Sequence, residues 1–484
     1  MKSFNYARRM STPPSTLTSL PHSTPEAQGV DPAGISAFLD AMETAGIELH
    51  SLMVIKHGQV LAQGWWSPYG ADRVHLMYSL SKSFTSTAAG FAVAEGLLDL
   101  DATVLSYFPE LDEEITDPRS RSILVRHVAA MASGHLSDTI ETVRATDPLN
   151  PVRGFLRIPP DREPGSFFAY NQPCTYSLGA IVQRQSGQTL TEYLRPRLFE
   201  PLGIGPAGWL QQPPGVDLGF SGLHLTTDAI ARLGLLYLNR GSWNGQQLLD
   251  AAWVDEATRR QVDNPDEPNP DWRQGYGFQF WIARHGYRGD GAYGQFSVVL
   301  PEQDVVIAIT ADTQEMQQVL DGLWEHVLPI LDAPIDAGPS AAGRALADRL
   351  EQASLPALAF GSGPSDWTGA QFTPTPAAAV SQSSLTGVEV NRDGERWRLT
   401  LHEGDATLSS TVGSGTWVCD DGPGAPMAVS GGWTDADTFR ADVIFLETPH
   451  RLRLTARIST GTYEAAWSSP RLHRGRLSDQ QMPR

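Results

Sequence analysis

The sequence predicts an α+β domain followed by an all-β domain in a chain of 484 residues. The first domain is predicted by strand-like segments at both ends of a long helical stretch, so that one sheet would be assembled from both ends. The second is predicted by strict alternation of apolar and polar residues beyond residue 364, which is typical of strands with one buried face. A chain of this length has room for two or three domains with large cores.

The expected elements of the α+β domain follow in chain order. Residues 52–66 predict two strands joined by a turn at His57 and Gly58. Apolar residues recur at helical spacing over 79–98, which places Ser79 at or near the start of a buried helix. After a helical and loop-rich middle, we expect three strands at 276–283, 292–300 and 305–311 and a closing helix at 316–331.

The remainder predicts a linker and the all-β domain, a barrel or sandwich. Residues 332–364 are rich in Ala, Gly and Pro, with one helical piece at 343–353. Asp393 and Gly394 then form a hairpin signal between alternating segments. The expected organisation is an N-terminal extension at 1–25, the α+β domain at 26–332, the linker at 333–364, the β domain at 365–475 and a tail at 476–484.

The charge balance argues against two classes of partner. With 36 basic and 55 acidic residues, the formal net charge of −19 repels nucleic-acid phosphates and anionic lipid. We find no apolar stretch long enough to span a membrane, and the polar N-terminus lacks the apolar core of a secretory signal. The two cysteines, Cys174 and Cys419, cannot build a disulfide framework. We expect a cytoplasmic protein without nucleic-acid or membrane partners.

The candidate catalytic motif in the sequence is Ser-Leu-Ser-Lys at 79–82. The sequence has no Gly-x-Ser-x-Gly, His-Glu-x-x-His, paired Cys-x-x-Cys or Gly-x-x-x-x-Gly-Lys motif, so we expect no metal and no nucleotide cofactor. Residues three apart share one helix face, so a neutral Lys82 amine can accept the Ser79 hydroxyl proton.

Lysine usage bears on the same pair. The chain has three lysines, Lys2, Lys56 and Lys82, and its other basic residues are arginine. A position that keeps lysine can require an amine that loses its proton, which arginine cannot supply. For the tetrapeptide alone, however, a lysine extending from a helix surface is the better interpretation.

The surroundings of this tetrapeptide resemble a known family. Segments 78–86 and 94–101 are similar to the active-serine segment of the serine β-lactamase and penicillin-binding-protein superfamily, in the branch of class C β-lactamases, D-aminopeptidases and family VIII carboxylesterases. Segments 123–135, 222–232 and 239–245 resemble later landmarks in the same order. The resemblance covers roughly 26–331 and implies an antiparallel sheet flanked by helices. Family architecture further implies a C-terminal barrel that closes over the active site or dimerises beside it.

The resemblance implies a second motif, Tyr-x-Asn, at Tyr170. It follows Pro164 and Gly165, and a phenol driven toward phenolate by the lysine would relay protons. Gln172 stands where asparagine is usual, and its longer amide can still bind Lys82 or a substrate carbonyl. Read alone, Tyr170 would be a core aromatic residue.

The third motif, Lys-Thr-Gly or a His/Trp-x-Gly variant, best matches residues 289–295, without a Lys or His at its first position. Gly291 and Gly294 fall on the family's glycines. The resemblance places the Ala292 amide beside that of Ser79 as an oxyanion hole. On its own the run would be a glycine-rich turn. The substrate-binding candidates are Gln172, Asp290, Gly291, Tyr293 and Trp281.

The missing cation in this motif bears on the substrate. Without this cation, neutral esters or amides are favoured as substrates over β-lactams and wall peptides, although Arg284 or Arg288 can supply the positive charge instead. The aromatic side chains of Trp281, Tyr293 and Phe296 can line an acyl pocket. We expect a serine hydrolase that acts on a small-molecule ester or amide through an acyl-enzyme, with a homo-oligomer left open. The alternatives are a D-stereospecific amidase or peptidase, a weak β-lactamase, and a sensor that is acylated but turns over slowly.

Other reactive side chains are expected to be structural. His127, His135 and His224 have no identifiable carboxylate partner, and the resemblance already supplies a lysine base. Cys174, four residues after Tyr170, is expected to be a small buried hydrophobic residue near the site.

Overall fold

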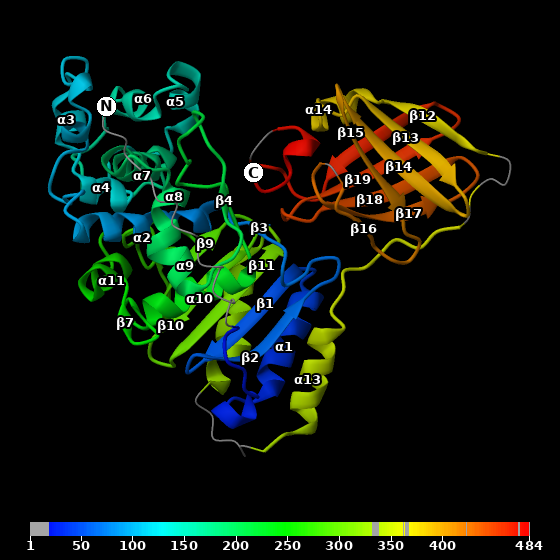
Figure 1. Cartoon of the computed structure of the whole chain (residues 1–484), viewed down its shortest axis with the longest axis horizontal. Helices are drawn as coiled ribbons and strands as arrows, with labels where there is room; N and C mark the ends of the chain where they lie inside the picture. The colour runs from blue at the N-terminus through cyan, green and yellow to red at the C-terminus, as the bar shows by residue number, and fades with distance from the viewer. Residues whose placement is uncertain are drawn as a thin grey trace, which may run out of the picture.

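We describe a computed structural model of the chain, for residues 19–331, 338–361, 363, 367–422, 424–472 and 475–483. The expected extension at 1–25 lies largely outside these residues, as do the first residues of the linker and the last residue of the tail. Figure 1 shows two bodies side by side, one of helices around a sheet and one built of strands.

The first domain is organised around a six-stranded sheet with the order β2-β1-β11-β10-β9-β8 (Figure 1). Its early hairpin, β1 (Glu48–Lys56) and β2 (Gln59–Trp65), lies beside the late strand β11 (Val305–Asp312), and neighbouring strands in this sheet are antiparallel. The prediction that one sheet is assembled from both ends of the domain is confirmed. The other strands are β8 (Trp281–Ile282), β9 (Tyr287–Gly291) and β10 (Gln295–Leu300).

The strand predictions before β10 were wrong in detail. The strand expected at 276–283 is reduced to β8, β9 was missed, and residues 292–294 form a turn. The missed strand contains glycine and aspartate, which are uncommon in strands. It pairs with β10 and packs closely on the segment before α2 (Ser81–Ala94), since a Cβ added at Gly291 would lie 2.1 Å from the Met77 carbonyl oxygen.

Helices cover both faces of this sheet, as the resemblance implies. One face carries α1 (Pro32–Thr44), α12 (Met316–Gly322) and α13 (Ala341–Glu351), whose apolar side chains share a core with those of β1 and β11. The other face carries α2 and α10 (Thr227–Leu238). Helix α13 is the helical piece expected inside the linker, and its Leu350 packs against Gly64 of β2.

Shorter elements complete the first domain around α2. The helices are α3 (Pro118–Ser122), α4 (Val125–Ala129), α5 (Ile140–Thr146), α6 (Pro151–Leu156), α7 (Gln172–Ser186), α8 (Leu190–Leu194), α9 (Glu200–Leu202) and α11 (Ala251–Thr258). The strands are β3 (His75–Leu76), β4 (Gly208–Trp209), β5 (Leu223–Leu225), β6 (Ser242–Trp243) and β7 (Gln246–Gln247).

The second domain is a nearly closed barrel. Its nine-stranded sheet has the order β15-β14-β13-β12-β20-β19-β18-β17-β16, and a bridge between Gly413 and Ser430 brings its two ends together. Apolar side chains such as Leu401 and Val443 fill the interior, so it is a packed core. Its elements are β12 (Gly369–Pro374), α14 (Pro376–Ser381), β13 (Gly387–Asp393), β14 (Arg396–Glu403), β15 (Ala406–Val412), β16 (Val418–Asp420), β17 (Met427–Trp433), β18 (Thr438–Phe445), β19 (Arg451–Arg457) and β20 (Thr462–Trp467).

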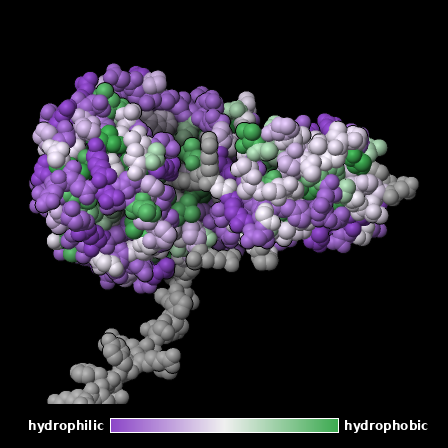
Figure 2. Space-filling view, turned by 90° about the horizontal axis from the view of Figure 1, so that it is seen from above, coloured by the Kyte–Doolittle hydropathy of each residue, from purple (hydrophilic) through white to green (hydrophobic). Residues whose placement is uncertain are grey.

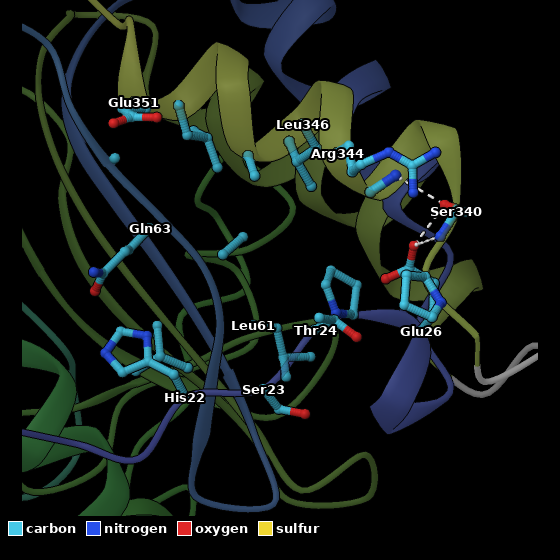
Figure 3. Close-up of a pocket in the computed structure, with 18 of the residues that line it drawn as sticks. His22, Ser23, Thr24, Glu26, Leu61, Gln63, Ser340, Arg344, Leu346 and Glu351 are labelled. Atoms are coloured by element: carbon cyan, nitrogen blue, oxygen red, sulfur yellow. Dashed lines mark hydrogen bonds between the residues drawn. The ribbon is translucent and has the colours of Figure 1, made fainter.

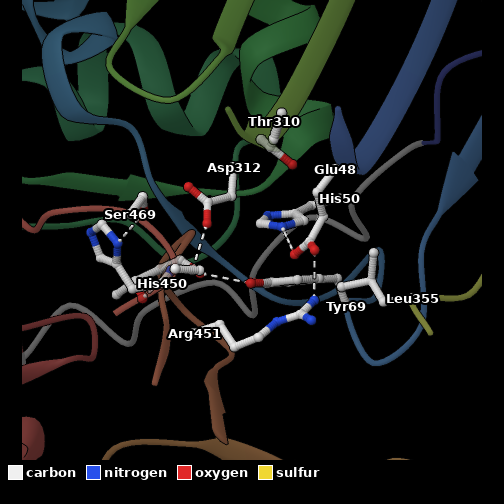
Figure 4. A network of polar contacts seen from close by, with 12 residues as sticks. Glu48, His50, Tyr69, Thr310, Asp312, Leu355, His450, Arg451 and Ser469 are labelled. Carbon is white, nitrogen blue, oxygen red and sulfur yellow. Dashed lines mark hydrogen bonds and ion pairs between the residues drawn. The ribbon is translucent and has the colours of Figure 1, made fainter. Parts of the chain in front are cut away.

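Buried polar contacts join the barrel to the first domain (Figure 4). Arg451 Nη2 donates to Glu48 Oε2 at 2.6 Å, and the Tyr69 hydroxyl donates to the Thr448 carbonyl at 2.9 Å. Arg451 is 7% exposed, so its charge is largely removed from water and depends on this pairing. The barrel is therefore seated in a defined position on the first domain.

Within the described ranges, no helix has the length and apolar character needed to cross a bilayer. Figure 2 shows a face on which hydrophilic residues predominate and hydrophobic residues are scattered in small groups.

Candidate active site

Ser79 and Lys82 lie together at the N-terminal end of α2. Ser79 belongs to a single 3-10 turn, η2 (Tyr78–Leu80), and Lys82 to the first turn of α2. Lys82 Nζ lies 3.0 Å from Ser79 Oγ. The predicted proximity is therefore present, although the helix expected at 79–98 is shorter.

Three oxygen atoms surround the Lys82 amine. Besides Ser79 Oγ, its Nζ contacts Gln172 Oε1 at 2.7 Å and the Phe220 carbonyl at 2.8 Å, and it donates an N–H to each of these two oxygens. The third position of the nitrogen faces the Ser79 hydroxyl. It carries an N–H in the protonated amine and a lone pair in the neutral amine.

The protonation of Lys82 is set by its burial. Desolvation lowers the pKa of this amine to about 7, while the nearby carboxylates of Asp138 and Asp290 partly oppose that shift. The side chain is 1% exposed. A large fraction of Lys82 is therefore neutral near pH 7, as a general base must be.

Tyr170 completes the cluster from a loop before α7. Its ring lies 4.7 Å from Lys82 Nζ and stacks on Trp281, and the side chain lines the same cleft as Ser79. Burial, reinforced by Asp290, raises the pKa of this phenol well above its ordinary value. The expectation of a phenolate was therefore wrong, because the low-dielectric surroundings favour the neutral phenol, a proton donor.

Gln172 is positioned by the start of α7. Its backbone N–H donates to Asp138 Oδ1 at 3.1 Å, while its side chain reaches Lys82 as expected. Sequence reasoning missed Asp138 and the Phe220 carbonyl. Asp138 lies in a loop without a motif, and a backbone carbonyl carries no residue-specific signal.

A cleft of about 660 Å³ opens at Ser79. It brings together six of the predicted site residues, namely Ser79, Tyr170, Gln172, Trp281, Asp290 and Ala292. It also includes residues that the sequence did not indicate, namely Phe168, Ala169, Asn264, Glu267, Asn269, Trp272, Gln314, Glu315, Met316, Gln317 and Leu472. Most come from loops, and Leu472 comes from the second domain, so only the tertiary fold collects them.

Three predicted pocket residues do not line this cleft. Gly291 faces the backbone of Met77, where no side chain fits. The Tyr293 ring packs on Tyr78 instead, and Phe296 is fully buried in the core on the other side of the sheet. These three predictions were wrong because alternation along β9 and β10 and the turn between them direct the residues away from the cleft.

The charged residues that line the cleft are acidic. Glu267, Asp290 and Glu315 belong to its lining, and no basic side chain does among the described residues. Arg288 is fully buried and donates through Nε to Asp290 Oδ2 at 3.0 Å. Arg284 is ion-paired with two carboxylates. Neither arginine is therefore available to replace the missing cation, so the expectation that one of them compensates for it was wrong.

The remaining reactive side chains lie outside the cleft. His127, His135 and His224 are held by neighbouring groups or the backbone, and burial lowers the pKa of His127 and His135. Cys174 is fully buried, which raises the pKa of its thiol to about 12. Within the part of the chain that the structure describes, no group of three or more His, Cys, Asp or Glu side chains is arranged to hold a metal.

A second cavity lies between β2 and α13 (Figure 3). It measures about 520 Å³ and has a mainly apolar lining that includes Leu61 and Leu346. At one end, Ser340 donates through its N–H to Glu26 Oε1 at 3.0 Å. None of the candidate catalytic residues lines it, so we assign it no chemistry.

The fold and the Ser79–Lys82–Tyr170 cluster define a serine hydrolase of the penicillin-recognising type. Residues 36–332 match the family model described as Beta-lactamase, and the chain belongs to that family.

Relatives and solved structures agree with this assignment. The chain is 24% identical over 309 residues to the 6-aminohexanoate-dimer hydrolase of Paenarthrobacter ureafaciens, covering 58% of this chain and 79% of that protein. It is 27% identical over 219 residues to Esterase EstB of Burkholderia gladioli, covering 39% and 55%. The fold resembles that of EstCE1, a hydrolase with promiscuous acyltransferase activity, with a TM-score of 0.50, 16% identity and coverage of 62% and 98%.

Proposed function

We propose that this hydrolase cleaves small esters or amides through an acyl-enzyme on Ser79, and that its substrates carry no negative charge. The observation that carries the proposal is the buried Lys82 amine, which lies 3.0 Å from Ser79 Oγ and has a pKa lowered by burial to about 7. The relatives named above support both kinds of substrate, since one is named an esterase and the other a 6-aminohexanoate-dimer hydrolase. A cytoplasmic location is part of this proposal and rests on composition.

In the proposed mechanism, Ser79 Oγ attacks the substrate carbonyl carbon while its proton moves to Lys82 Nζ. The carbonyl oxygen becomes an oxyanion between the amides of Ser79 and Ala292, each worth about 3 kcal/mol. Tyr170 donates a proton to the leaving alcohol or amine, and Lys82 restores that proton. Water then attacks the acyl-enzyme while Lys82 accepts a proton from it, and Lys82 delivers this proton to Ser79 Oγ as the carboxylic acid leaves.

Hydrolysis of p-nitrophenyl butyrate is expected to exceed hydrolysis of nitrocefin by at least about 100-fold in kcat/KM, because no basic side chain among the described cleft-lining residues can bind a β-lactam carboxylate. The measurement is initial rates on both substrates and on a D-alanyl anilide. Peptide mapping after a fluorophosphonate should place the adduct on Ser79.

Other results would contradict this proposal. Preferred turnover of the anilide or of nitrocefin would indicate a D-amidase or a β-lactamase. Stoichiometric acylation without turnover would indicate a sensor. An adduct on another residue would exclude Ser79 as the nucleophile.

Substrate charge provides a second prediction. A p-nitrophenyl ester with a terminal ammonium group should exceed its carboxylate-terminated isostere by about 10-fold in kcat/KM, because Glu267 and Glu315 line the cleft and the charge of Asp290 is balanced by Arg288. The two esters are compared at low and high ionic strength. In a Glu267→Gln, Glu315→Gln double variant the preference should shrink, and a preference for the carboxylate in the unaltered protein would refute the charge argument.

A further inference from the structure

Two tyrosines with unusual backbone conformation flank the proposed oxyanion hole. Tyr78 immediately precedes Ser79 and has φ of 47°, and Tyr293 immediately follows Ala292 and has φ of 69°. Bulky residues rarely adopt this left-handed region, which costs free energy and persists only where the surroundings hold it. Something must therefore hold both tyrosines beside the two amide donors.

The groups that hold them belong to the second domain. The Tyr78 hydroxyl and His450 Nε2 are hydrogen-bonded at 2.5 Å, and the Tyr293 hydroxyl donates to the Pro470 carbonyl. The rings of Tyr78, Tyr293 and His450 also pack on one another, with centroids 5.3 to 5.8 Å apart and T-shaped geometry. All three side chains are buried. One aromatic cluster thus spans the two domains behind the proposed oxyanion hole.

The barrel holds its part of this cluster firmly. His450 lies in the turn between β18 and β19, and its Nδ1 is 3.2 Å from Ser469 Oγ, a pair visible in Figure 4. The same turn accepts a backbone hydrogen bond, from Leu76 N to the Glu447 carbonyl at 2.9 Å. The strand that leads into Tyr78 is therefore also attached to the barrel.

We propose that the second domain positions the oxyanion hole. His450 and Pro470 fix the rings of Tyr78 and Tyr293, and these rings fix the backbone on either side of the Ser79 and Ala292 amides, since Tyr78 precedes Ser79 and Tyr293 follows Ala292. Tyr78, Tyr293 and His450 are positioning residues, since none of them lines the cleft. This inference rests on the proposed function, because it assumes that the two amides stabilise an oxyanion.

A contact that served only to attach the domains would affect stability alone. The ion pair between Arg73 and Asp421 is such a contact, with distances of 2.7 and 3.0 Å, and it involves neither tyrosine. An Arg73→Gln variant therefore removes an interdomain attachment and leaves the aromatic cluster intact. It is the matched control for substitutions within the cluster.

The test uses Tyr78→Phe, Tyr293→Phe and the double variant in the full chain, which delete the hydroxyls and keep the rings. We expect kcat on p-nitrophenyl butyrate to fall about 10-fold in each single variant and about 100-fold in the double variant, with KM little changed. The same kinetics are measured on the p-nitrophenyl thionoester. Thiocarbonyl sulfur accepts hydrogen bonds weakly, so the preference for the ester over the thionoester should fall with kcat. Arg73→Gln should keep both kcat and this preference.

Thermal melting distinguishes a loss of kcat in folded protein, which a positioning role predicts, from a loss caused by unfolding. A folded double variant with unchanged kcat and ester preference would overturn the inference, and so would an equal loss in Arg73→Gln. If the variants melt too low to compare, His450→Gln, which keeps a donor at the ring position, replaces them and must give the same loss of ester preference. An unaltered protein that neither hydrolyses the ester nor is acylated at Ser79 would instead refute the proposed function.

Discussion

Replacing Ser79 by alanine should lower kcat/KM for p-nitrophenyl butyrate by at least about 10⁴-fold, because none of the other described residues that line the cleft is a serine, threonine or cysteine that could form the acyl-enzyme. The side chain is small and the hydroxyl is its only polar group, so the fold should be retained. Stopped assays at high enzyme concentration measure the residual rate, and intact mass should show no adduct after treatment with the fluorophosphonate.

A matched serine variant tests the specificity of this effect. Ser122 lies at the exposed end of α3, and Ser122→Ala should retain full activity and full labelling. Residual activity above about 1% in a contaminant-free Ser79→Ala preparation would show that another group carries the reaction. In that case the contacts around Lys82 would need a different explanation.

Substitution of Lys82 should have the second largest effect. Lys82→Arg keeps a positive charge but cannot release a proton, so acylation loses its base and kcat/KM should fall about 10³-fold. In the unaltered protein, the pKa of about 7 predicts that kcat/KM rises about tenfold per pH unit below pH 7 and levels off above it. The measurement is the pH profile of kcat/KM from pH 5 to 9 for both proteins.

Lys56→Arg is the control for this substitution. Lys56 is also a buried lysine, but it lies on β1 and donates to the Leu331 carbonyl, outside the cleft. Its replacement should leave the pH profile unchanged, even if the melting temperature falls. A rising limb that persists near pH 7 in Lys82→Arg would assign that limb to a different group.

The fold was predictable where the local sequence pattern is typical of one kind of secondary structure. Strand-like runs joined by a turn marked β1 and β2, alternation marked strands of the barrel, and the helical spacing after Ser79 marked α2. Strand β9 was missed because Gly289, Asp290 and Gly291 have low strand propensity. These residues form a strand because they pair with β10 and because the segment before α2 packs closely on Gly289 and Gly291. Such tertiary contacts cannot be read from the local sequence.

The site was predictable only where a motif connects residue type to role. The placement of Ser79, Lys82, Tyr170 and Gln172 in one cluster followed from the resemblance and is present in the structure. The protonation of Tyr170 could not be predicted, because it depends on burial that only the assembled fold determines. The same holds for Trp272 and Leu472, which reach the cleft from loops that carry no pattern.

The pairing of early and late segments also sets the order in which the protein can mature on the ribosome. Ser51 is hydrogen-bonded to Thr310, 259 residues later, and Tyr78 is bonded to His450, 372 residues later. At about 5–20 residues per second, translation needs about 20–75 s between the last two. Until Thr310 has been made, about 13–52 s after Ser51 at the same rate, the edge of β1 lacks its partner β11 and is open to aggregation. We therefore expect the nascent chain to require chaperones and to gain activity only near the end of its synthesis.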